Sequence, residues 1–401
     1  MVTLDSILLF VLFFLPYLVT SHNNNFYGLC LSNESDNQPH HNIVHAVGSK
    51  NYQSILESSI HNARFNNSNV PKPYYIIVPQ NKEQVRGAMI CCKKLGFESR
   101  IRSGGHDYEG LSFISYKPYC LIDLSSLRKI DIDVQEKTAW VEAGATIGEL
   151  YYNIGNKSNT LGFPAGTCPS VGVGGHISGG GQGRKHHLRR LMRKKFPELK
   201  LKSKDCEEMS WINSTIRIDS YRKDSRIEDL LERNKEKRLT FYKTKSDYVT
   251  KALSEKALQG LWNVFKSTGD GLVILTPHGG RMSEILEDAI PFPHRKGVLY
   301  NLQYFALWHH PNQTAEKIKF DWVNGVYDYM GKFVSNPRTA YLNTRDLELG
   351  RTLIGNEKYS ETKSWGEMYF KGNFEKLARV KYSVDPTNYF RNEQSIPPLA
   401  P

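Results

Sequence analysis

The densest glycine cluster of the chain constrains its fold more than any other feature. Nine of the 22 residues from Gly162 to Gly183 are glycine, in the sequence GFPAGTCPSVGVGGHISGGGQG. Glycine lets backbone N–H groups approach an anion closely and permits positive φ angles that side chains forbid. The apolar Val171, Val173 and Ile177 predict short buried segments, whereas flexible linkers contain mainly Gly and Ser. We therefore favour a loop that binds the phosphates of a dinucleotide over a linker.

A second, shorter glycine motif lies upstream. The sequence RSGGHDYEG (residues 102–110) follows an extended run and places His106 and Tyr108 just beyond a Gly-Gly pair. With a β-rich run from Tyr74 to Val78 and an amphipathic helical stretch between Asn81 and Gly96, it forms a strand–helix–strand unit. Cofactor sites in α/β folds lie at such strand ends, so we expect one near His106. Three more segments continue the α/β pattern: extended runs at Tyr119–Leu124 and Thr138–Ala143 and a helix at Ile147–Ile154.

The two motifs resemble those of the berberine-bridge-enzyme-like family of plant flavoprotein oxidases, FAD-linked oxidases with a PCMH-type FAD-binding domain. In that family the His of SGGHDYEG and the Cys of GTCPxVGxxGHxxGGGxG both bond covalently to FAD. The matching residues here are His106 and Cys168. A third similarity is the C-terminal YFRNEQSIPPL, Tyr389 to Leu399. The resemblance covers most of the chain, with the three motifs in the family's order.

The resemblance implies a two-domain fold of the α/β (α+β) class. It consists of a vanillyl-alcohol-oxidase/PCMH-like FAD-binding domain and a substrate domain built on an antiparallel sheet, both incomplete. The implied division is a signal peptide (1–21), a truncated FAD-binding domain (22–183), a remnant of the substrate domain (184–335) and a berberine-bridge-type segment that returns to the FAD domain (336–401). Besides the two tethers, the implied FAD-binding residues are Arg102, Ser103, Gly104, Gly105, Gly172, Gly174, Gly175, His176, Gly179, Gly180 and Asn392. No metal site is expected.

Directly after Gly183 the chain departs from the family. There the rest of the FAD domain follows in the family, including a second Gly-rich segment, and then the first strands of the substrate domain. Here a densely basic run, Arg184 to Lys195, leads straight into FPELKLKSKDCEEMSW, which resembles a position well inside the substrate domain. A long segment is missing, and a mis-spliced gene model, a pseudogene and a true deletion would each explain it. The basic run favours a solvated helix face over a nuclear-localisation or nucleic-acid patch.

The catalytic base is a second departure. The family usually has YLNYRD, whose second Tyr takes part in catalysis, and Thr344 stands at that position. Many members place a Glu or Lys where Asn301 stands in YNLQY. Neither residue titrates near neutral pH. This leaves Tyr108 as the catalytic phenol, as an orienting group or weak base, with Gln303 as its hydrogen-bond partner. Tyr341 is a distant substitute, because a shift of three residues reverses its face on a strand.

The N-terminus and the cysteines predict export. Ile7 to Val19 is almost wholly apolar and too short to span a bilayer, which is typical of a signal-peptide core. Six cysteines are present, and setting Cys168 aside for the flavin leaves an odd number, so at least one other thiol stays free. The resemblance pairs Cys30 with Cys91. Sequons for N-glycosylation occur at Asn33, Asn66, Asn156, Asn213 and Asn312.

Charge predicts a polyanionic partner, since the formal net charge is +12 and the isoelectric point about 9.2. A basic surface alone does not distinguish nucleic acid from wall polysaccharide. Secretion to the plant cell wall (apoplast) favours the polysaccharide, so we expect no nucleic-acid partner, no transmembrane segment and a monomer.

Two functions stay open. The first is a secreted FAD-dependent oxidoreductase that oxidises alcohols, oligosaccharides or alkaloid-like molecules, with FAD bonded through His106 and Cys168. Oxygen would be the acceptor, because the resemblance places Val171 at a position that gates oxygen and a small residue there is permissive. The second is a non-catalytic relic, a defective gene product or a wall-binding glycoprotein. The glycine motifs indicate descent from an FAD-dependent oxidoreductase. The missing segment and the lost bases favour a chain that is not catalytic at present.

Overall fold

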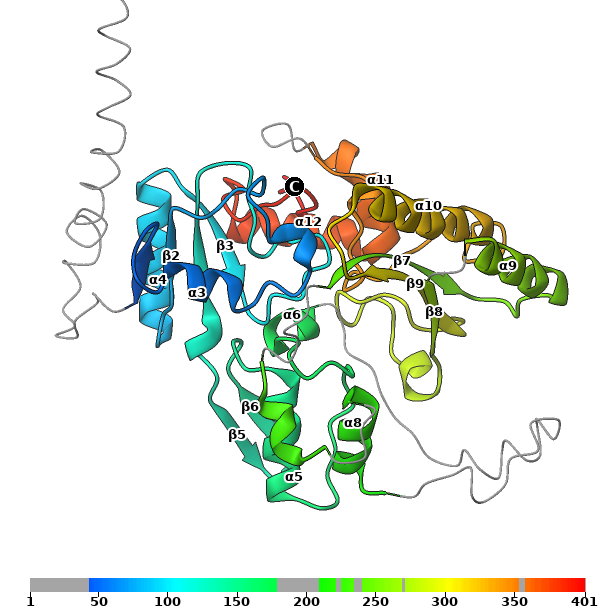
Figure 1. Cartoon of the computed structure of the whole chain (residues 1–401), viewed down its shortest axis with the longest axis horizontal. Helices are drawn as coiled ribbons and strands as arrows, with labels where there is room; N and C mark the ends of the chain where they lie inside the picture. The colour runs from blue at the N-terminus through cyan, green and yellow to red at the C-terminus, as the bar shows by residue number, and fades with distance from the viewer. Residues whose placement is uncertain are drawn as a thin grey trace, which may run out of the picture.

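The computed structural model describes residues 43–178, 209–220, 225–233, 240–268, 271–352 and 358–400. Several features predicted from the sequence lie outside them: the signal peptide, Cys30, Asn33, Gly179, Gly180 and the basic run Arg184–Lys195. The described residues form three sheets with flanking helices (Figure 1). The predicted α/β class is therefore confirmed.

The first sheet carries the shorter glycine motif. Its strands, in spatial order, are β1 (Val44–Ala46), β2 (Tyr75–Ile77), β4 (Tyr119–Asp123) and β3 (Glu98–Arg102). Strands β2 and β3 run parallel to β4, and β1 is antiparallel to β2. Helix α4 (Lys82–Lys94) packs on one face and α3 (Tyr52–Glu57) on the other. Parallel strands buried on both faces put the end of β3, and the loop after it, at the carboxyl edge of the sheet.

A hairpin and four helical segments form a second lobe, towards the bottom of Figure 1. The hairpin is β5 (Ile130–Asp133) and β6 (Thr138–Val141), followed by α5 (Ile147–Lys157) and α6 (Val173–Ser178). Two later segments, α8 (Trp211–Ser220) and the 3-10 helix η7 (Ile227–Leu231), pack against α5. They were assigned by resemblance to the substrate-domain remnant, and in this structure they contact the lobe that precedes the missing segment.

The third sheet is antiparallel, as expected for the substrate domain. Its order is β7 (Phe241–Val249), β9 (Tyr300–Trp308) and β8 (Gly271–Pro277). Helices α9 (Glu255–Thr268) and α10 (Gln313–Met330) cover one face, where Trp322, Val323 and Val326 pack on Leu302 and Tyr304. The other face of the sheet points towards the glycine motifs.

Helices α11 (Tyr359–Phe370) and α12 (Asn373–Val384) lead the chain back to the first sheet. Beyond them, the Tyr389 hydroxyl lies 2.9 Å from Ser99 Oγ, and Arg391 Nε donates to Glu98 Oε1 at 3.2 Å. The C-terminal segment therefore contacts β3.

An uncovered apolar surface lies on β8, the edge strand of the third sheet. Leu272, Ile274 and Leu275 are 51%, 42% and 55% exposed. In the second lobe, Trp140 on β6 is 84% exposed. Edge strands with exposed apolar side chains are unusual in stable monomers and promote aggregation. Within the described residues, these apolar side chains have no cover from another element.

Several sequence-based predictions can be located on the surface. Asn156, Asn213 and Asn312 are exposed, and Asn66 is half-buried. Cys91 is buried and its thiol is free in the structure, while its implied partner Cys30 lies outside the described residues, so their pairing stays a prediction. Ile177 is a correction: we predicted a buried residue, and it is 59% exposed on the outer side of the short helix α6.

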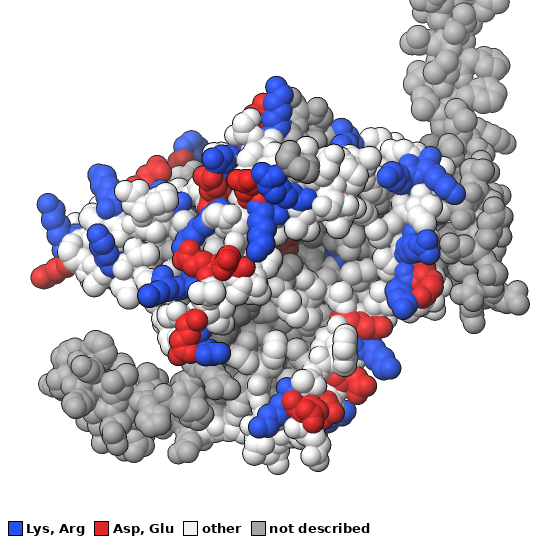
Figure 2. Space-filling model, turned by 180° about the vertical axis from the view of Figure 1, so that it is seen from behind, with Lys and Arg blue, Asp and Glu red and all other residues white. Residues whose placement is uncertain are grey.

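The surface charges are mixed on the face drawn in Figure 2, where Lys and Arg side chains lie among Asp and Glu. No helix among the described residues is long and apolar enough to cross a membrane.

Candidate functional site

The two glycine motifs meet backbone to backbone. A Cβ added at Gly104 would lie 2.2 Å from Gly172 N, and one added at Gly172 would lie 2.3 Å from Gly104 N. Gly105 has a φ of +72° and sits so close to Ser59 that an added Cβ would lie 1.9 Å from its carbonyl oxygen. Only glycine fits these positions. The 103–105 turn and the 170–172 turn therefore form one junction at the carboxyl end of β3.

His106 lies at this junction. Its Nε2 is 2.9 Å from Ser170 Oγ in the second motif. Its ring stacks on that of His61, with centroids 3.8 Å apart. Burial lowers the pKa of His106 well below its ordinary value, and the charge of His61 lowers it further. His106 is therefore an uncharged imidazole at neutral pH, which is the nucleophilic form.

The second predicted tether, Cys168, is exposed. It lies near enough to Tyr108 for its charge to influence the pKa of the phenol. His106, Cys168 and Tyr108 therefore share one site, although Cys168 is 62 positions beyond His106 in the sequence.

Tyr108 and Gln303 are in contact, as predicted. Gln303 Nε2 donates to the Tyr108 hydroxyl at 3.0 Å and to Thr244 Oγ1 at 3.2 Å. The Tyr108 ring meets the rings of Tyr242 and Phe305 edge-on. Burial raises the pKa of Tyr108 to about 12, against the opposing effect of the Gln303 hydrogen bond. The phenol is therefore protonated at neutral pH, the form that can donate a hydrogen bond.

The two positions at which the family has titrating residues are buried. Thr344 is 4% exposed and Asn301 is 5% exposed, and Asn301 Nδ2 donates to Asp247 O at 2.9 Å. Tyr341 is a correction. The segment is a turn closed by Thr344 N and Tyr341 O at 2.9 Å, not a strand, so alternation does not decide which way Tyr341 faces. Its charge influences the pKa of Tyr108, so it lies close to the site.

His176, from the second motif, carries a buried polar atom without a protein partner. Its Nε2 has no hydrogen bond among the described residues, while its backbone oxygen accepts from Asn343 Nδ2 at 3.1 Å. A Cβ added at the neighbouring Gly175 would meet open space. A buried ring nitrogen without a hydrogen-bond partner among the described residues, at a glycine junction, fits a polar ligand such as FAD.

Arg102, Ser103 and Asn392 are also predicted to bind FAD, but their side chains form hydrogen bonds with other residues of this chain. The Arg102 guanidinium is fully buried and bonds to Asp123, Leu56 O and Ile55 O at 2.6, 2.7 and 2.6 Å. The Ser103 hydroxyl donates to Ala143 O. Asn392 Oδ1 accepts from Gln394 N at 2.9 Å within its own turn. These side chains shape the loops around the junction, so any contact with a cofactor would come from their backbone. Gly174 packs against Ala143, with an added Cβ 2.9 Å from its oxygen.

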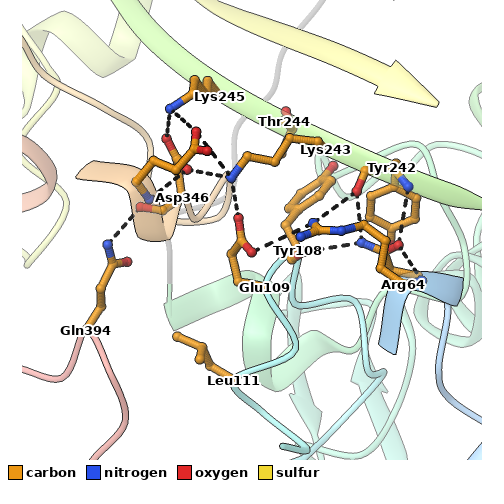
Figure 3. Close-up of polar contacts among 12 residues, drawn as sticks. Arg64, Tyr108, Glu109, Leu111, Tyr242, Lys243, Thr244, Lys245, Asp346 and Gln394 are labelled. Carbon is orange, nitrogen blue, oxygen red and sulfur yellow. Dashed lines mark hydrogen bonds and ion pairs between the residues drawn. The ribbon is translucent and has the colours of Figure 1, made fainter. Parts of the chain in front are cut away.

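A buried ion network joins the site to the third sheet (Figure 3). Lys243 Nζ donates to Glu109 Oε1 at 2.6 Å and to Asp346 Oδ1 at 2.7 Å. Lys245 Nζ donates to Asp346 Oδ2 at 2.7 Å. Glu109 directly follows Tyr108, so the network ties the catalytic motif to β7 and to the 341–350 turn.

Sequence reasoning missed this network and His61. The pattern Lys-Thr-Lys-Ser-Asp at residues 243–247 was the available signal for the network, since two lysines two apart in a buried strand share a face and require carboxylate partners. No local pattern marks His61, which reaches His106 only through the fold.

Comparisons with known proteins identify the family. The FAD binding domain family model matches residues 73–205, and the model described as berberine and berberine-like matches residues 340–397. Berberine bridge enzyme-like 18 of Arabidopsis thaliana is 35% identical over 525 positions, covering 98% of each chain. Tetrahydroberberine oxidase of Berberis wilsoniae is 34% identical, covering 89% of this chain and 91% of its own.

Solved structures agree. The grass pollen allergen Phl p 4, which has glucose dehydrogenase activity, is 34% identical with a TM-score of 0.86, covering 94% of this chain and 100% of the allergen. A variant of berberine bridge enzyme is 30% identical with a TM-score of 0.86 at the same coverage.

The alignment with the Arabidopsis relative also gives a lower bound on the number of positions that this chain lacks. It spans 525 positions while this chain has 401 residues, so at least 124 positions of the alignment face gaps in this chain. The relatives that carry these positions include oxidases and dehydrogenases of alkaloids and sugars. With these matched domains, this identity and this coverage, the chain belongs to the berberine bridge enzyme-like family of FAD-binding oxidoreductases.

Proposed function

We propose that this protein is a secreted FAD-dependent oxidoreductase that oxidises a hydroxyl- or amine-bearing small molecule and passes the electrons to oxygen. The meeting of the two glycine motifs at Gly104 and Gly172, with His106 and Cys168 beside it, carries the proposal. When bound, FAD supplies an acceptor for two electrons, and the protein supplies orientation and proton handling.

His106 and Cys168 would hold the cofactor by two covalent bonds. The imidazole of His106 is uncharged, which is its nucleophilic form, and the thiol of Cys168 is exposed to solvent. His176 Nε2 would bond a polar atom of the cofactor, since it lacks a partner among the described residues. Gly172 and Gly175 would let the backbone approach the pyrophosphate.

Tyr108 would orient the substrate. Gln303 Nε2 donates to the phenol oxygen, which leaves the phenol O–H to donate to a substrate oxygen or nitrogen. Because burial keeps the phenol protonated, Tyr108 holds a proton at the reacting atom rather than removing one.

The substrate side of the site is apolar and aromatic. Leu272 and Ile274 on β8 lie directly opposite Phe305 and Gln303 on β9, and opposite residues of an antiparallel pair share a face. Tyr108 contacts Phe305 on the same face. This surface favours an aromatic or alkaloid-like substrate over an oligosaccharide, which would require more hydrogen-bonding groups.

Val171 supports oxygen as the acceptor. The family resemblance places it at an oxygen-gating position. Wild-type Phl p 4 is a glucose dehydrogenase, while its isoleucine-to-valine variant is a glucose oxidase. A valine at this position is smaller than an isoleucine and therefore favours access of oxygen to the flavin.

Acid precipitation tests the covalent tethers. We expect bound flavin to remain yellow and attached after precipitation, because a covalent bond survives unfolding. His106→Ala or Cys168→Ala alone should leave one bond, and the double variant should release all flavin into the supernatant. Absorbance of the pellet and supernatant measures this, and His310→Gln, a change at an exposed histidine, serves as the control. Flavin retained by the double variant would assign the attachment to other residues.

Secretion, N-glycosylation and a cell-wall location belong to the same proposal. The apolar N-terminus and the exposed sequons at Asn156, Asn213 and Asn312 support it. The charge of +12 supports a polyanionic wall polysaccharide as a partner, and we propose a monomer. Intact-mass measurement of the plant-expressed protein should show cleavage near residues 20–23 and a mass loss on glycosidase treatment. A retained Met1 with no mass loss would contradict export.

The lost bases favour one alternative. Thr344 and Asn301 cannot take up a proton near neutral pH, so a chain that binds FAD without turnover remains the second candidate. Reduction of the bound flavin by candidate aromatic alcohols and alkaloids, followed as bleaching of its absorption, separates a slow enzyme from a non-catalytic relic.

A further inference from the structure

The ring of His61 covers one face of the His106 ring. The centroids are 3.8 Å apart and the planes are inclined by 24°. His61 Nε2 lies 2.9 Å from Gly104 O. A carbonyl oxygen only accepts, so Nε2 carries a hydrogen and donates it. His61 therefore bonds to the backbone two residues before His106 while it stacks on the ring itself.

The residue after His61 fixes this arrangement. Asn62 Nδ2 donates to Tyr108 O at 3.3 Å and to Tyr242 O at 3.0 Å, and Asn62 Oδ1 accepts from Tyr242 N at 3.2 Å. These bonds connect the backbone beside His61 both to the motif that contains His106 and to strand β7. The stack of the two imidazoles is thus part of the junction.

His106 is held from two sides. His61 covers a face of its ring, and Ser170 Oγ lies 2.9 Å from its Nε2 at the edge. A ring with one covered face and one bonded edge has a single orientation, which a reaction at the remaining nitrogen requires.

Resting on the function proposed above, we propose that His61 is a positioning residue for covalent flavin attachment, which fixes the His106 ring and keeps its imidazole uncharged. Attachment requires a ring nitrogen with a lone pair, which an imidazolium lacks. In the net reaction, a bond between that nitrogen and the flavin's methyl carbon replaces one N–H and one C–H bond. The two protons and two electrons released pass to dioxygen, giving hydrogen peroxide.

The charges around the pair agree with this role. Two imidazolium rings in contact repel, so a charge on His61 disfavours one on His106. Burial lowers the pKa of His106, and His61 is the neighbour whose charge lowers it further among the described residues. Asp107, the adjacent carboxylate, pairs with Arg345 at 3.5 Å, and the phenol of Tyr108 is protonated, with a pKa of about 12.

Chemical labelling of the apoprotein tests the charge state directly. Diethyl pyrocarbonate reacts with the uncharged imidazole, and peptide mass spectrometry reads His106 between pH 4 and pH 8. In His61→Gln, which can still donate to Gly104 O, we expect the labelling midpoint of His106 to rise by about one pH unit, because a neighbouring charge is removed. His310→Gln, at an exposed histidine, should leave the midpoint unchanged. An unchanged midpoint in His61→Gln would overturn the proposal.

Flavin attachment provides the second measurement, in this chain and in a version with the family's missing segment restored. At a pH at least one unit below the parent's labelling midpoint, the rate of acid-stable flavin formation should fall up to about tenfold in His61→Gln, since one pKa unit there changes the uncharged fraction of His106 about tenfold. Raising the pH to 8 should restore the attachment rate of His61→Gln. The rate of His61→Phe, which keeps a ring stacked on His106, should recover more fully than that of His61→Gln. A loss that pH does not restore would assign His61 a purely structural role. If no parent protein attaches flavin, the proposed function fails, while the labelling result still decides the role of His61.

Discussion

Inserting the family's missing segment after Gly183 is expected to turn a poorly folding chain into a stable flavoprotein. The 401-residue chain should aggregate and bind FAD weakly or not at all, because its third sheet ends at β8 with Leu272, Ile274 and Leu275 about half exposed. Each Å2 of apolar surface left in water forgoes about 25 cal/mol. The hydrophobic free energy lost with several missing strands would exceed a typical net free energy of unfolding, which is roughly 5–15 kcal/mol. The basic run Arg184–Lys195 cannot substitute, because its charges resist burial.

Expressing both versions side by side measures this effect. The segment can be taken from the Arabidopsis relative, whose alignment contains at least 124 positions that this chain lacks. Melting temperature, soluble yield and flavin per protein are the readouts. A third version, this chain with Trp140→Thr, changes an exposed apolar side chain outside the site: it should gain solubility without gaining flavin. Equal yield, cooperative melting and stoichiometric flavin in the unmodified chain would show that the segment is dispensable.

Local features of the fold could be predicted because their causes are local. Asn81 caps α4 by accepting from Gln84 N at 2.8 Å, and Gly96 has a φ of +75° just after the helix ends. Both are read from residue types at fixed spacing. The strand β3 and the turn at Gly104 and Gly105 follow from the same kind of pattern.

The composition of the site was less predictable because its contacts join distant segments. Glu109 and Lys243 are 134 positions apart, and Gln303 reaches Tyr108 across 195 positions. The placement of Tyr341 failed for another reason: we assumed a strand, and a turn of 341–344 has no alternation of faces. Ile177 was expected to be buried from its hydrophobicity alone, but the neighbours that would cover it depend on the rest of the chain.

Replacing Lys243 is expected to destabilise the protein by about 3–5 kcal/mol, the cost of leaving a buried ion network without one partner. Lys243, Asp346 and Glu109 have side chains only 3%, 1% and 6% exposed. Lys243→Met leaves Glu109 with only the longer contact to Arg64, whose Nη1 lies 3.8 Å from Glu109 Oε2, while Asp346 keeps its bond from Lys245. Adding Glu109→Gln should recover part of the loss, because it removes the buried carboxylate that has lost its close partner. Urea unfolding of the version with the restored segment measures each change.

The matched control is an ion pair of similar length at the surface. Lys317 Nζ and Asp321 Oδ2 are 2.5 Å apart with side chains 75% and 60% exposed, so Lys317→Met should cost less than about 1 kcal/mol. A loss for Lys243→Met no larger than that of the control would mean that the network contributes little to stability.

The pH dependence of the Lys243→Met effect identifies its electrostatic origin. Burial alone would raise the pKa of Asp346, but the ammonium groups of Lys243 and Lys245 outweigh it and hold that pKa below the ordinary 3.8. A carboxyl with a lowered folded pKa stabilises above its unfolded pKa, and this contribution is lost as the pH falls through the folded value.

The lysine titrates at the other end of the pH range. Burial alone would lower the pKa of Lys243, but Glu109 and Asp346 outweigh it and raise that pKa above the ordinary 10.5. The contribution of Lys243 to the free energy of unfolding is therefore fully present below pH 10.5 and is lost as the pH rises through the pKa of the folded state. The difference in unfolding free energy between the parent and Lys243→Met should thus stay constant from about pH 5 to pH 9 and shrink beyond both ends. A difference that does not change with pH would indicate that Lys243 stabilises the fold through the packing of its aliphatic chain and not through its charge.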